Sequence, residues 1–248
     1  MASYIGLSGY SYKAWQGPDR FYPPDIKSTA FLRYYATKYR TVELDGVWYR
    51  LPSEKTVQAW LTDTPPHFLY APKAHRGITH IHRLKPEGLP MLMAMLQRLD
   101  PLHEAGKLGP ILIQLPPNLK RDDGRLETFL GSLPTTHQWA VEFRHESWQA
   151  DEIERILRRY SIAWAAVETD EHEAEYRDTT RFRYVRLRKN AYGQTELRQW
   201  AERFQNASQQ GQDCFVYCKH EDDGSPWLWA DELHRLLNSE TISKQPWG

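Results

Sequence analysis

Acidic and basic side chains occur inside or directly after short apolar runs of this sequence. Glu43 and Glu142 lie within such runs, and Arg144 and Arg186 follow the same pattern. Carboxylates and guanidinium groups that converge in a partly dry pocket shift each other's pKa and can serve as acid–base pairs. Arginines in such a pocket also bind phosphate or carboxylate through paired hydrogen bonds. These residues predict a pocket for a small anionic or polyhydroxylated ligand, with Glu43 or Glu142 as the general base.

The apolar runs themselves predict eight β-strands. They cover residues 4–9, 41–45, 67–73, 109–115, 138–144, 162–168, 182–188 and 214–220. Amphipathic stretches with helical spacing lie between most of them, at residues 28–39, 54–62, 88–104, 123–132, 151–160, 194–209 and 226–238. The short, polar link at residues 171–181 is the weakest part of this pattern.

Strands that alternate with helices predict parallel βαβ units. Eight such units in 248 residues fit a single-domain (β/α)8 barrel of TIM type over residues 1–238, followed by a C-terminal tail at residues 239–248. A doubly wound open sheet is the alternative, and it is disfavoured because no GxGxxG or GxxxxGK motif follows a strand. In a TIM barrel the active site lies at the C-terminal ends of the strands, where this chain carries its charged residues.

Alternation along each strand indicates which side chains point toward the barrel axis. Val42 and Leu44 take the helix-facing side, so Glu43 and Asp45 share the other side. The same argument directs a further set inward: Ser8, Lys73, Gln114, Ala140, Glu142, Arg144, Arg186 and Arg188. In two strands the inward side chain is not decided. The candidates are Glu168 and Asp170 in the sixth strand, and Lys219 or His220 in the eighth. A slip of one residue in any strand would reverse its faces.

Roles follow from these positions. The predicted catalytic residues are Glu43, Glu142 and Asp45. The predicted substrate-binding residues are Tyr12, Trp15, Tyr49, Lys73, His75, Gln114, Arg144, Arg186, Arg188 and Lys219. The alternative interpretation is a structural ion network that plugs the barrel, in which each glutamate neutralises an arginine. Under that alternative, the substitution Glu142→Gln would unfold the protein and would not act on turnover alone.

Aromatic residues in the first two loops leave two interpretations open. Tyr12 and Trp15 follow a turn at Gly9, and Tyr49 lies in the second loop. Their rings could form a wall against a sugar or a base, and the Tyr49 hydroxyl could reach the mouth of the barrel. Equally, the rings could only cover the core, and Gly9 could only permit a tight turn.

Four histidines come just after predicted strands: His75, His80, His145 and His220. A metal or proton-transfer role is geometrically possible at such positions. The inward positions are mostly Glu, Arg and Lys, however, and several cations would repel a metal ion. We therefore predict no metal and no cofactor, and we expect ordinary hydrogen-bonded histidines in the loops.

Composition narrows the classes of partner. Lys plus Arg and Asp plus Glu number 32 each, so the formal net charge is zero, which argues against a basic nucleic-acid-coating protein. No apolar run approaches the roughly 18 residues of a membrane span, and the first residues lack the pattern of a secretory signal. The expectation is a cytoplasmic protein without a membrane partner.

The two cysteines, Cys214 and Cys218, lie in one apolar run. If that run is a strand, their Cα atoms are roughly 13 Å apart, beyond the roughly 7 Å limit for a disulfide. They are predicted to be reduced thiols in the core.

Seven stretches of the chain resemble the YecE-like proteins that carry the domain of unknown function 72. They lie at residues 6–23, 41–60, 73–80, 107–117, 140–148, 184–188 and 216–222, and the resemblance extends from about residue 4 to residue 238. It implies a TIM-type barrel, in agreement with the count of eight units. It implies no activity, because the biochemical activity of that family is not established.

Two segments depart from the pattern of the family. Where the family usually has Asn followed by Thr-Phe-Tyr, this chain has Asp45 and then Gly-Val-Trp-Tyr. Where the family often has an Asn-rich segment after the last strand, this chain has Lys219 and His220. The first change adds an anion and the second a cation, which predicts a different ligand preference.

Three functions fit these observations. The first is a metal-independent hydrolase, lyase or isomerase that acts on a small phosphorylated or carbohydrate-like substrate. The alternatives are a nucleic-acid-binding protein or metal-assisted phosphodiesterase, and a ligand-binding protein without catalysis. The sequence does not predict the substrate or the oligomeric state.

Overall fold

Eight parallel strands form the centre of the molecule, in a computed structural model that describes residues 1–219 and 225–243, with side chains up to residue 238. The strands are β1 (Ser3–Ser8), β2 (Thr41–Leu44), β3 (Leu69–Pro72), β4 (Ile111–Gln114), β5 (Trp139–Glu142), β6 (Ala163–Glu168), β7 (Phe182–Leu187) and β8 (Asp213–Cys218). Their order in the sheet is β3-β2-β1-β8-β7-β6-β5-β4. Each of the eight predicted strands is confirmed.

The two outer strands of that order, β3 and β4, approach each other and nearly close the sheet. Isolated parallel bridges join Tyr70 to Leu108 and Lys73 to Leu112. The backbone N–H of Ala74 also donates to the carbonyl of Leu112 at 2.8 Å. The sheet is therefore a nearly closed eight-stranded barrel, as the alternation of strands and helices predicts.

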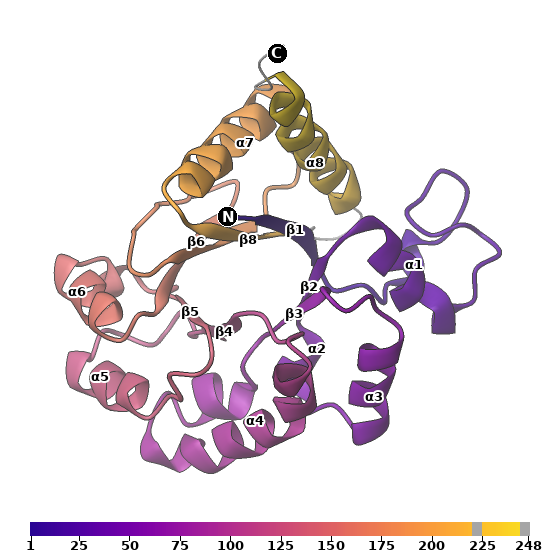
Figure 1. The fold of residues 1–248 in the computed structure, drawn as a ribbon. Helices are drawn as coiled ribbons and strands as arrows, with labels where there is room; N and C mark the ends of the chain where they lie inside the picture. The colour runs from indigo at the N-terminus through magenta and orange to yellow at the C-terminus, as the bar shows by residue number, and fades with distance from the viewer. Residues whose placement is uncertain (220–224, 244–248) are drawn as a thin grey trace.

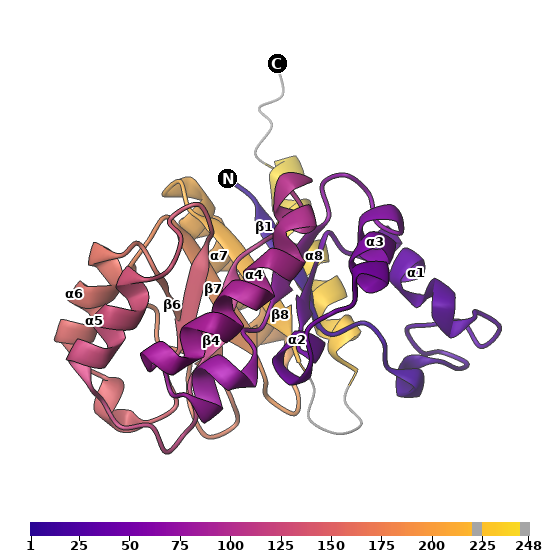
Figure 2. The ribbon, with the colours of Figure 1, turned by 90° about the horizontal axis from the view of Figure 1, so that it is seen from below.

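Helices surround the barrel (Figure 1). The longer ones are α1 (Phe31–Lys38), α3 (Glu54–Thr62), α4 (Leu89–Glu104), α5 (Asp123–Gly131), α6 (Asp151–Arg159), α7 (Gln194–Gln209) and α8 (Pro226–Ser243). Short turns of helix are α2 (Gly46–Tyr49), η1 (Lys13–Trp15), η2 (Ser28–Ala30), η3 (Gly77–Ile81), η4 (Pro86–Gly88) and η5 (Glu146–Trp148). In Figure 2, α5 and α6 lie on the opposite side of the barrel from α1 and α3.

Two features of the helices differ from the expectation. The helix α8 continues to Ser243, past the predicted end of the domain at residue 238. The single turn α2, which follows β2 directly, has no counterpart among the predicted helices. The polar link at residues 171–181 contains no helix, so β6 passes to β7 without the covering element of the other units.

Alternation along the strands divides the core into two layers. Val42, Leu44, Val185 and Leu187 belong to the larger layer, which lies between the sheet and the helices. A second layer fills the inside of the barrel and consists of Ala71, Leu112, Ala140, Ala163, Ala165, Phe182, Tyr184, Phe215 and Tyr217. Alanines from β3, β5 and β6 thus leave room for the rings of β7 and β8. The inside is a packed core, and the charged residues lie above it.

Both cysteines are buried in the layer beneath the helices and are not joined by a disulfide. This confirms the prediction of reduced core thiols. Among the described helices, none combines the length and the apolar character needed to cross a membrane.

Candidate functional site

Glu43 forms the first half of a buried ion network at the C-terminal ends of the strands. Its Oε1 accepts hydrogen bonds from the Ser8 hydroxyl at 2.6 Å and from Arg186 Nη2 at 2.8 Å. Its Oε2 accepts a hydrogen bond from the Tyr184 hydroxyl at 2.7 Å. Glu43 and Arg186 are both completely buried. Both oxygens of this carboxylate are therefore held by groups of the barrel itself.

Glu142 forms the second half of the same network. Its Oε2 accepts from Arg186 Nη1 at 2.7 Å, and its Oε1 accepts from Gln114 at 2.8 Å and from Arg144 at 3.0 Å. Burial alone would raise the pKa of Glu142, but Arg186 and Arg144 outweigh it and lower the pKa to about 2. A carboxylate with so low a pKa is a weak base near neutral pH. The geometry thus favours a structural ion network at Glu43, Arg186 and Glu142, with Arg186 shared between the two glutamates.

Asp45 lies above this network, among three cations. Its Oδ1 is 3.9 Å from Arg186 Nη2 and 4.0 Å from Lys73 Nζ, and its Oδ2 is 3.8 Å from Lys219 Nζ. These separations are those of ion pairs but exceed hydrogen-bond lengths. Within the described part of the chain, Oδ1 of Asp45 is buried and has no hydrogen-bond partner. A polar group of a ligand could therefore bind between this carboxylate and its cations.

The same contacts settle the orientation of the eighth strand. Lys219 reaches Asp45, so Lys219 takes the inward position, whereas His220 lies outside the described residues. The two departures from the family pattern, the acidic one and the basic one, consequently face each other across the mouth.

Lys73 follows β3 and is almost buried, with 11% of its side chain exposed. Burial and the neighbouring Arg186 guanidinium lower the pKa of Lys73 to about 8, although Asp45 opposes the shift. The ammonium group also lies 5.0 Å from the centre of the Trp48 ring. Trp48 belongs to α2, the turn absent from the predicted helices.

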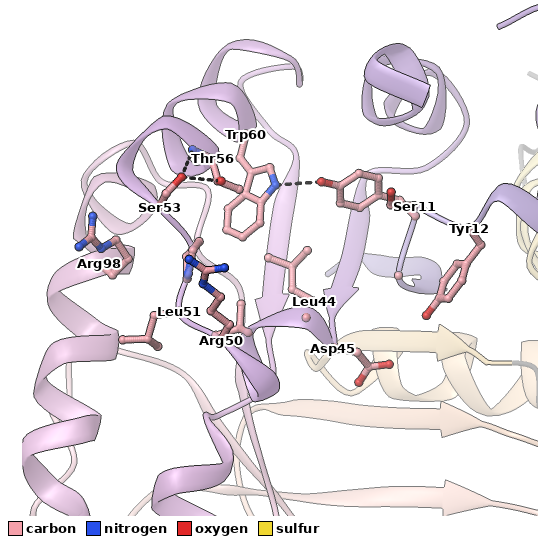
Figure 3. Close-up of a pocket in the computed structure, with 15 residues that line it drawn as sticks. Ser11, Tyr12, Leu44, Asp45, Arg50, Leu51, Ser53, Thr56, Trp60 and Arg98 are labelled. Atoms are coloured by element: carbon pink, nitrogen blue, oxygen red, sulfur yellow. Dashed lines mark hydrogen bonds between the residues drawn. The ribbon is translucent and has the colours of Figure 1, made fainter. Parts of the chain in front are cut away.

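Two cavities flank this mouth. One has a volume of about 740 Å³ and is lined by Glu142, Arg144 and Arg188, together with residues of the loops after β5 and β6. The other has a volume of about 770 Å³ and lies between the loops that follow β1 and β2. Figure 3 shows Tyr12 and Asp45 at one end of this second cavity and Arg98 at the other. Each cavity thus includes a residue of the charged cluster.

Two of the predicted substrate-binding residues, Trp15 and Tyr49, make their ring contacts outside the charged cluster. Trp15 is only 2% exposed and packs against Tyr12, Phe21 and Trp227, so the prediction of Trp15 as a wall for a ligand is corrected. The reason is an aromatic cluster that joins the first loop to α8, which no local pattern reveals. Tyr49 is 64% exposed and lies edge-on against Trp48.

His75 has a local structural role. Its Nδ1 accepts a hydrogen bond from the backbone N–H of Gly77 at 3.0 Å, at the start of η3. The nearby His80 and His82 have His-x-His spacing, but Nδ1 of His80 bonds the Thr79 hydroxyl at 2.8 Å. Across residues 1–219 and 225–238, no three His, Cys, Asp or Glu side chains gather as a metal site would require.

Sequence reasoning missed Tyr184, which belongs to the cluster. Tyr184 shares the inward face with Arg186 and donates to Glu43, so strand alternation carried the signal for it. Glu168, in contrast, is on the outer side of β6, where it accepts a hydrogen bond from Trp200 of α7 at 2.9 Å. Trp48 could not be assigned to the cluster because α2 is a single turn without periodicity.

The fold and this cluster define a class of protein: a single-domain, nearly closed eight-stranded barrel of TIM type whose strands carry a buried ion network and several basic side chains at their C-terminal ends. Comparison with known protein families gives the particular group. The chain belongs to the family described as protein of unknown function DUF72, whose model matches residues 4–248. The resemblance expected from the sequence is thereby confirmed.

Known relatives agree with this assignment. The UPF0759 protein YunF of Bacillus subtilis is 25% identical, over 98% of this chain and 97% of that protein. A crystal structure of a DUF72 family protein from Thermotoga maritima has a TM-score of 0.80 and 25% identity, and covers 96% of this chain and 100% of that one. A DUF72 family protein from Enterococcus faecalis, at 19% identity and a TM-score of 0.73 over 95% of each chain, shares the fold.

Proposed function

We propose that this protein is an enzyme that binds a small anionic substrate, phosphorylated or carbohydrate-like, at the C-terminal face of the barrel. The observation that carries the proposal is the gathering of basic side chains there, two of them on one cavity. Lys73, Arg144, Arg186, Arg188 and Lys219 lie at this face with the carboxylates of Glu43, Asp45 and Glu142. Arg144 and Arg188 line one cavity, together with Glu146, Glu173 and Glu175. Arginine side chains that face a cavity suit phosphate or carboxylate, and the acidic side chains beside them suit the hydroxyl groups of a sugar.

The contacts divide the three carboxylates by role. Glu43 and Glu142 hold Arg186 and keep the inside of the barrel rigid. Asp45 is the carboxylate with an unpaired oxygen and partial exposure, at 18% of its side chain. We therefore assign proton transfer to Asp45 and Lys73, and substrate binding to Arg144, Arg188 and Lys219.

A panel of phosphorylated and carboxylated metabolites tests the proposal by thermal shift. A ligand at 100 times its Kd stabilises a protein by about 2.7 kcal/mol, which raises the Tm of a chain of this size by about 5–10 °C. We expect such a shift in the wild type and a smaller one in Arg144→Gln and in Lys219→Gln. Arg155→Gln, on the outer face of α6, is the matched control and should keep the full shift.

Short single-stranded DNA belongs in the same panel. Stabilisation by DNA that falls steeply with salt, without any shift from metabolites, would replace the proposal with nucleic-acid binding. A metabolite that binds but is not converted would indicate that the protein binds a ligand and is not an enzyme.

A further inference from the structure

The amine of Lys73 differs from that of Lys219, the other lysine of the mouth, in its burial: 11% of the Lys73 side chain is exposed, against 25% for Lys219. Its Nζ makes no hydrogen bond to any residue between 1 and 219 or between 225 and 238, but this nitrogen is not fully buried and stays accessible from the mouth. A ligand that enters the mouth can therefore reach this nitrogen. For comparison, the buried Lys107 at the opposite end of the barrel donates three hydrogen bonds, to the carbonyls of Leu61 and Thr64 and to the Thr64 hydroxyl.

The surroundings of this amine come from several elements. The charged groups that face it are Asp45 and Glu43 from β2 and the turn after it, Glu142 from β5, Arg186 from β7, and His80 from η3. The Trp48 ring covers one side at 5.0 Å. The nearest carboxylate oxygen is the unpaired Oδ1 of Asp45, at 4.0 Å. This distance is too long for a hydrogen bond, so the amine is not tied to the carboxylate, and it places a proton acceptor beside the nitrogen.

We propose that Lys73 forms an imine with the carbonyl group of an anionic aldehyde or ketone. This inference rests on the proposed function, because the cations of the mouth would hold the phosphate or carboxylate of that substrate. Burial and Arg186 favour the uncharged amine, since they lower the pKa of Lys73 to about 8. Near pH 7.5 the uncharged fraction of such an amine is roughly 200-fold larger than that of an ordinary lysine.

The reaction is balanced without a further reactant. The nitrogen lone pair of Lys73 attacks the carbonyl carbon, a C–N bond forms, and an electron pair of the C=O bond moves onto the oxygen. The nitrogen gives up its two protons one after the other, and Asp45 is placed to carry each of them to that oxygen, which becomes first a hydroxyl group and then water as the C–O bond breaks. Water leaves and a C=N bond remains, so the amine and the carbonyl compound become an imine and water. When protonated, the imine attracts electrons and weakens bonds at the neighbouring carbon.

Pyridoxal 5′-phosphate, which carries an aldehyde and a phosphate, is a suitable probe for this amine. The full-length protein is incubated with the probe, reduced with borohydride at successive times, and mapped by mass spectrometry. The exposed Lys55 on α3 is the reference within the same sample. We expect Lys73 to be labelled at least about tenfold faster than Lys55, and the rate to rise as the pH approaches 8. Lys73→Arg keeps the positive charge but removes the nucleophilic amine, so the label at position 73 should be absent while Lys55 is still labelled.

The possible outcomes separate this inference from the proposed function. If Lys73 is labelled no faster than Lys55, the imine is excluded, whether or not metabolites stabilise the protein. If Lys73 is labelled rapidly and inorganic phosphate slows the reaction, both proposals are supported. If labelling is rapid but phosphate has no effect, the reactive amine stands and the anion site fails. Because Lys55 is measured in the wild type, the test does not depend on the folding of Lys73→Arg.

Discussion

Arg186 holds together the buried ion network beneath the mouth of the barrel. Its two terminal nitrogens bind Glu43 and Glu142 from opposite sides of the barrel, and all three side chains are buried. An ion network of this kind adds little net stability as a whole, because removing the charges from water offsets their attraction. Loss of a single partner is strongly destabilising, however, because the remaining charge stays buried and uncompensated.

The substitution Glu142→Gln tests this interdependence. It leaves Arg186 with one hydrogen-bonded carboxylate, Glu43, and Arg144 without its carboxylate partner, and we expect the free energy of unfolding to fall by about 3–5 kcal/mol. Denaturant unfolding measures the change. Glu54→Gln, at an exposed surface pair with Arg98, is the control and should change stability by less than about 1 kcal/mol. A loss below 1 kcal/mol for Glu142→Gln would restore this carboxylate as a candidate general base.

Acid stability gives a second test of the same carboxylate. The pKa of Glu142 is about 2 in the folded protein, below its ordinary value of 4.5. The unfolded chain therefore takes up the proton first as the pH falls, and the stabilisation present above pH 4.5 is lost between about 4.5 and 2. We expect the gap in free energy of unfolding between wild type and Glu142→Gln to shrink over this range. A gap that stays constant from pH 6 to pH 3 would contradict the low pKa.

Glu43 lies next to Ser8 because the strands β1 and β2 approach each other closely. These strands pair only at Leu7 with Val42 and Ser8 with Glu43. Below that point the Tyr35 hydroxyl lies between them, since it accepts from the backbone N–H of Leu7 at 2.8 Å and donates to the carbonyl of Thr41 at 2.9 Å. Gly6 lies at the narrowest place, because an added Cβ would be 2.2 Å from the Thr41 carbonyl oxygen.

We expect Gly6→Ala to separate β1 from β2 and to cost about 3 kcal/mol in free energy of unfolding, at the upper end of ordinary overpacking. The obstacle is backbone, which cannot rotate out of the way. Gly124→Ala on α5 is the control of opposite sign: its nearest neighbour would be 4.0 Å away, and alanine favours a helix by about 1 kcal/mol over glycine. Equal effects of the two substitutions would refute this account of the strand contact.

The elements with strong periodicity could be predicted from the sequence. Alternation identified all eight strands and the inward direction of Glu43, Glu142 and Arg186, because one face of each strand packs under helices. The turn α2 could not be predicted, since four residues have no period. The burial of Trp15 could not be predicted either, because its partner Trp227 lies more than 200 residues away in the chain. Distances within the mouth depend on such contacts and were likewise beyond the reach of the sequence.

Charge is balanced over the whole molecule but not within it. Lys plus Arg equals Asp plus Glu along the chain, but the charges are not spread evenly, and five basic side chains gather at the mouth around the ion network. An anion bound there is held by partly exposed groups such as Arg144 and Lys219, whose attraction salt weakens. We expect the affinity for an anionic metabolite to fall as ionic strength rises from 0.05 to 0.5 M. Binding that is insensitive to salt would indicate a site elsewhere on the protein.

The most direct test of the cationic mouth is calorimetric titration of the wild type with the metabolite that stabilises it most. We expect one site per chain, an affinity at least about tenfold weaker in Arg144→Gln, and an unchanged affinity in Arg155→Gln. If Arg144→Gln binds as tightly as the wild type, or if no anionic metabolite binds the wild type at all, the C-terminal face of this barrel is not an anion site.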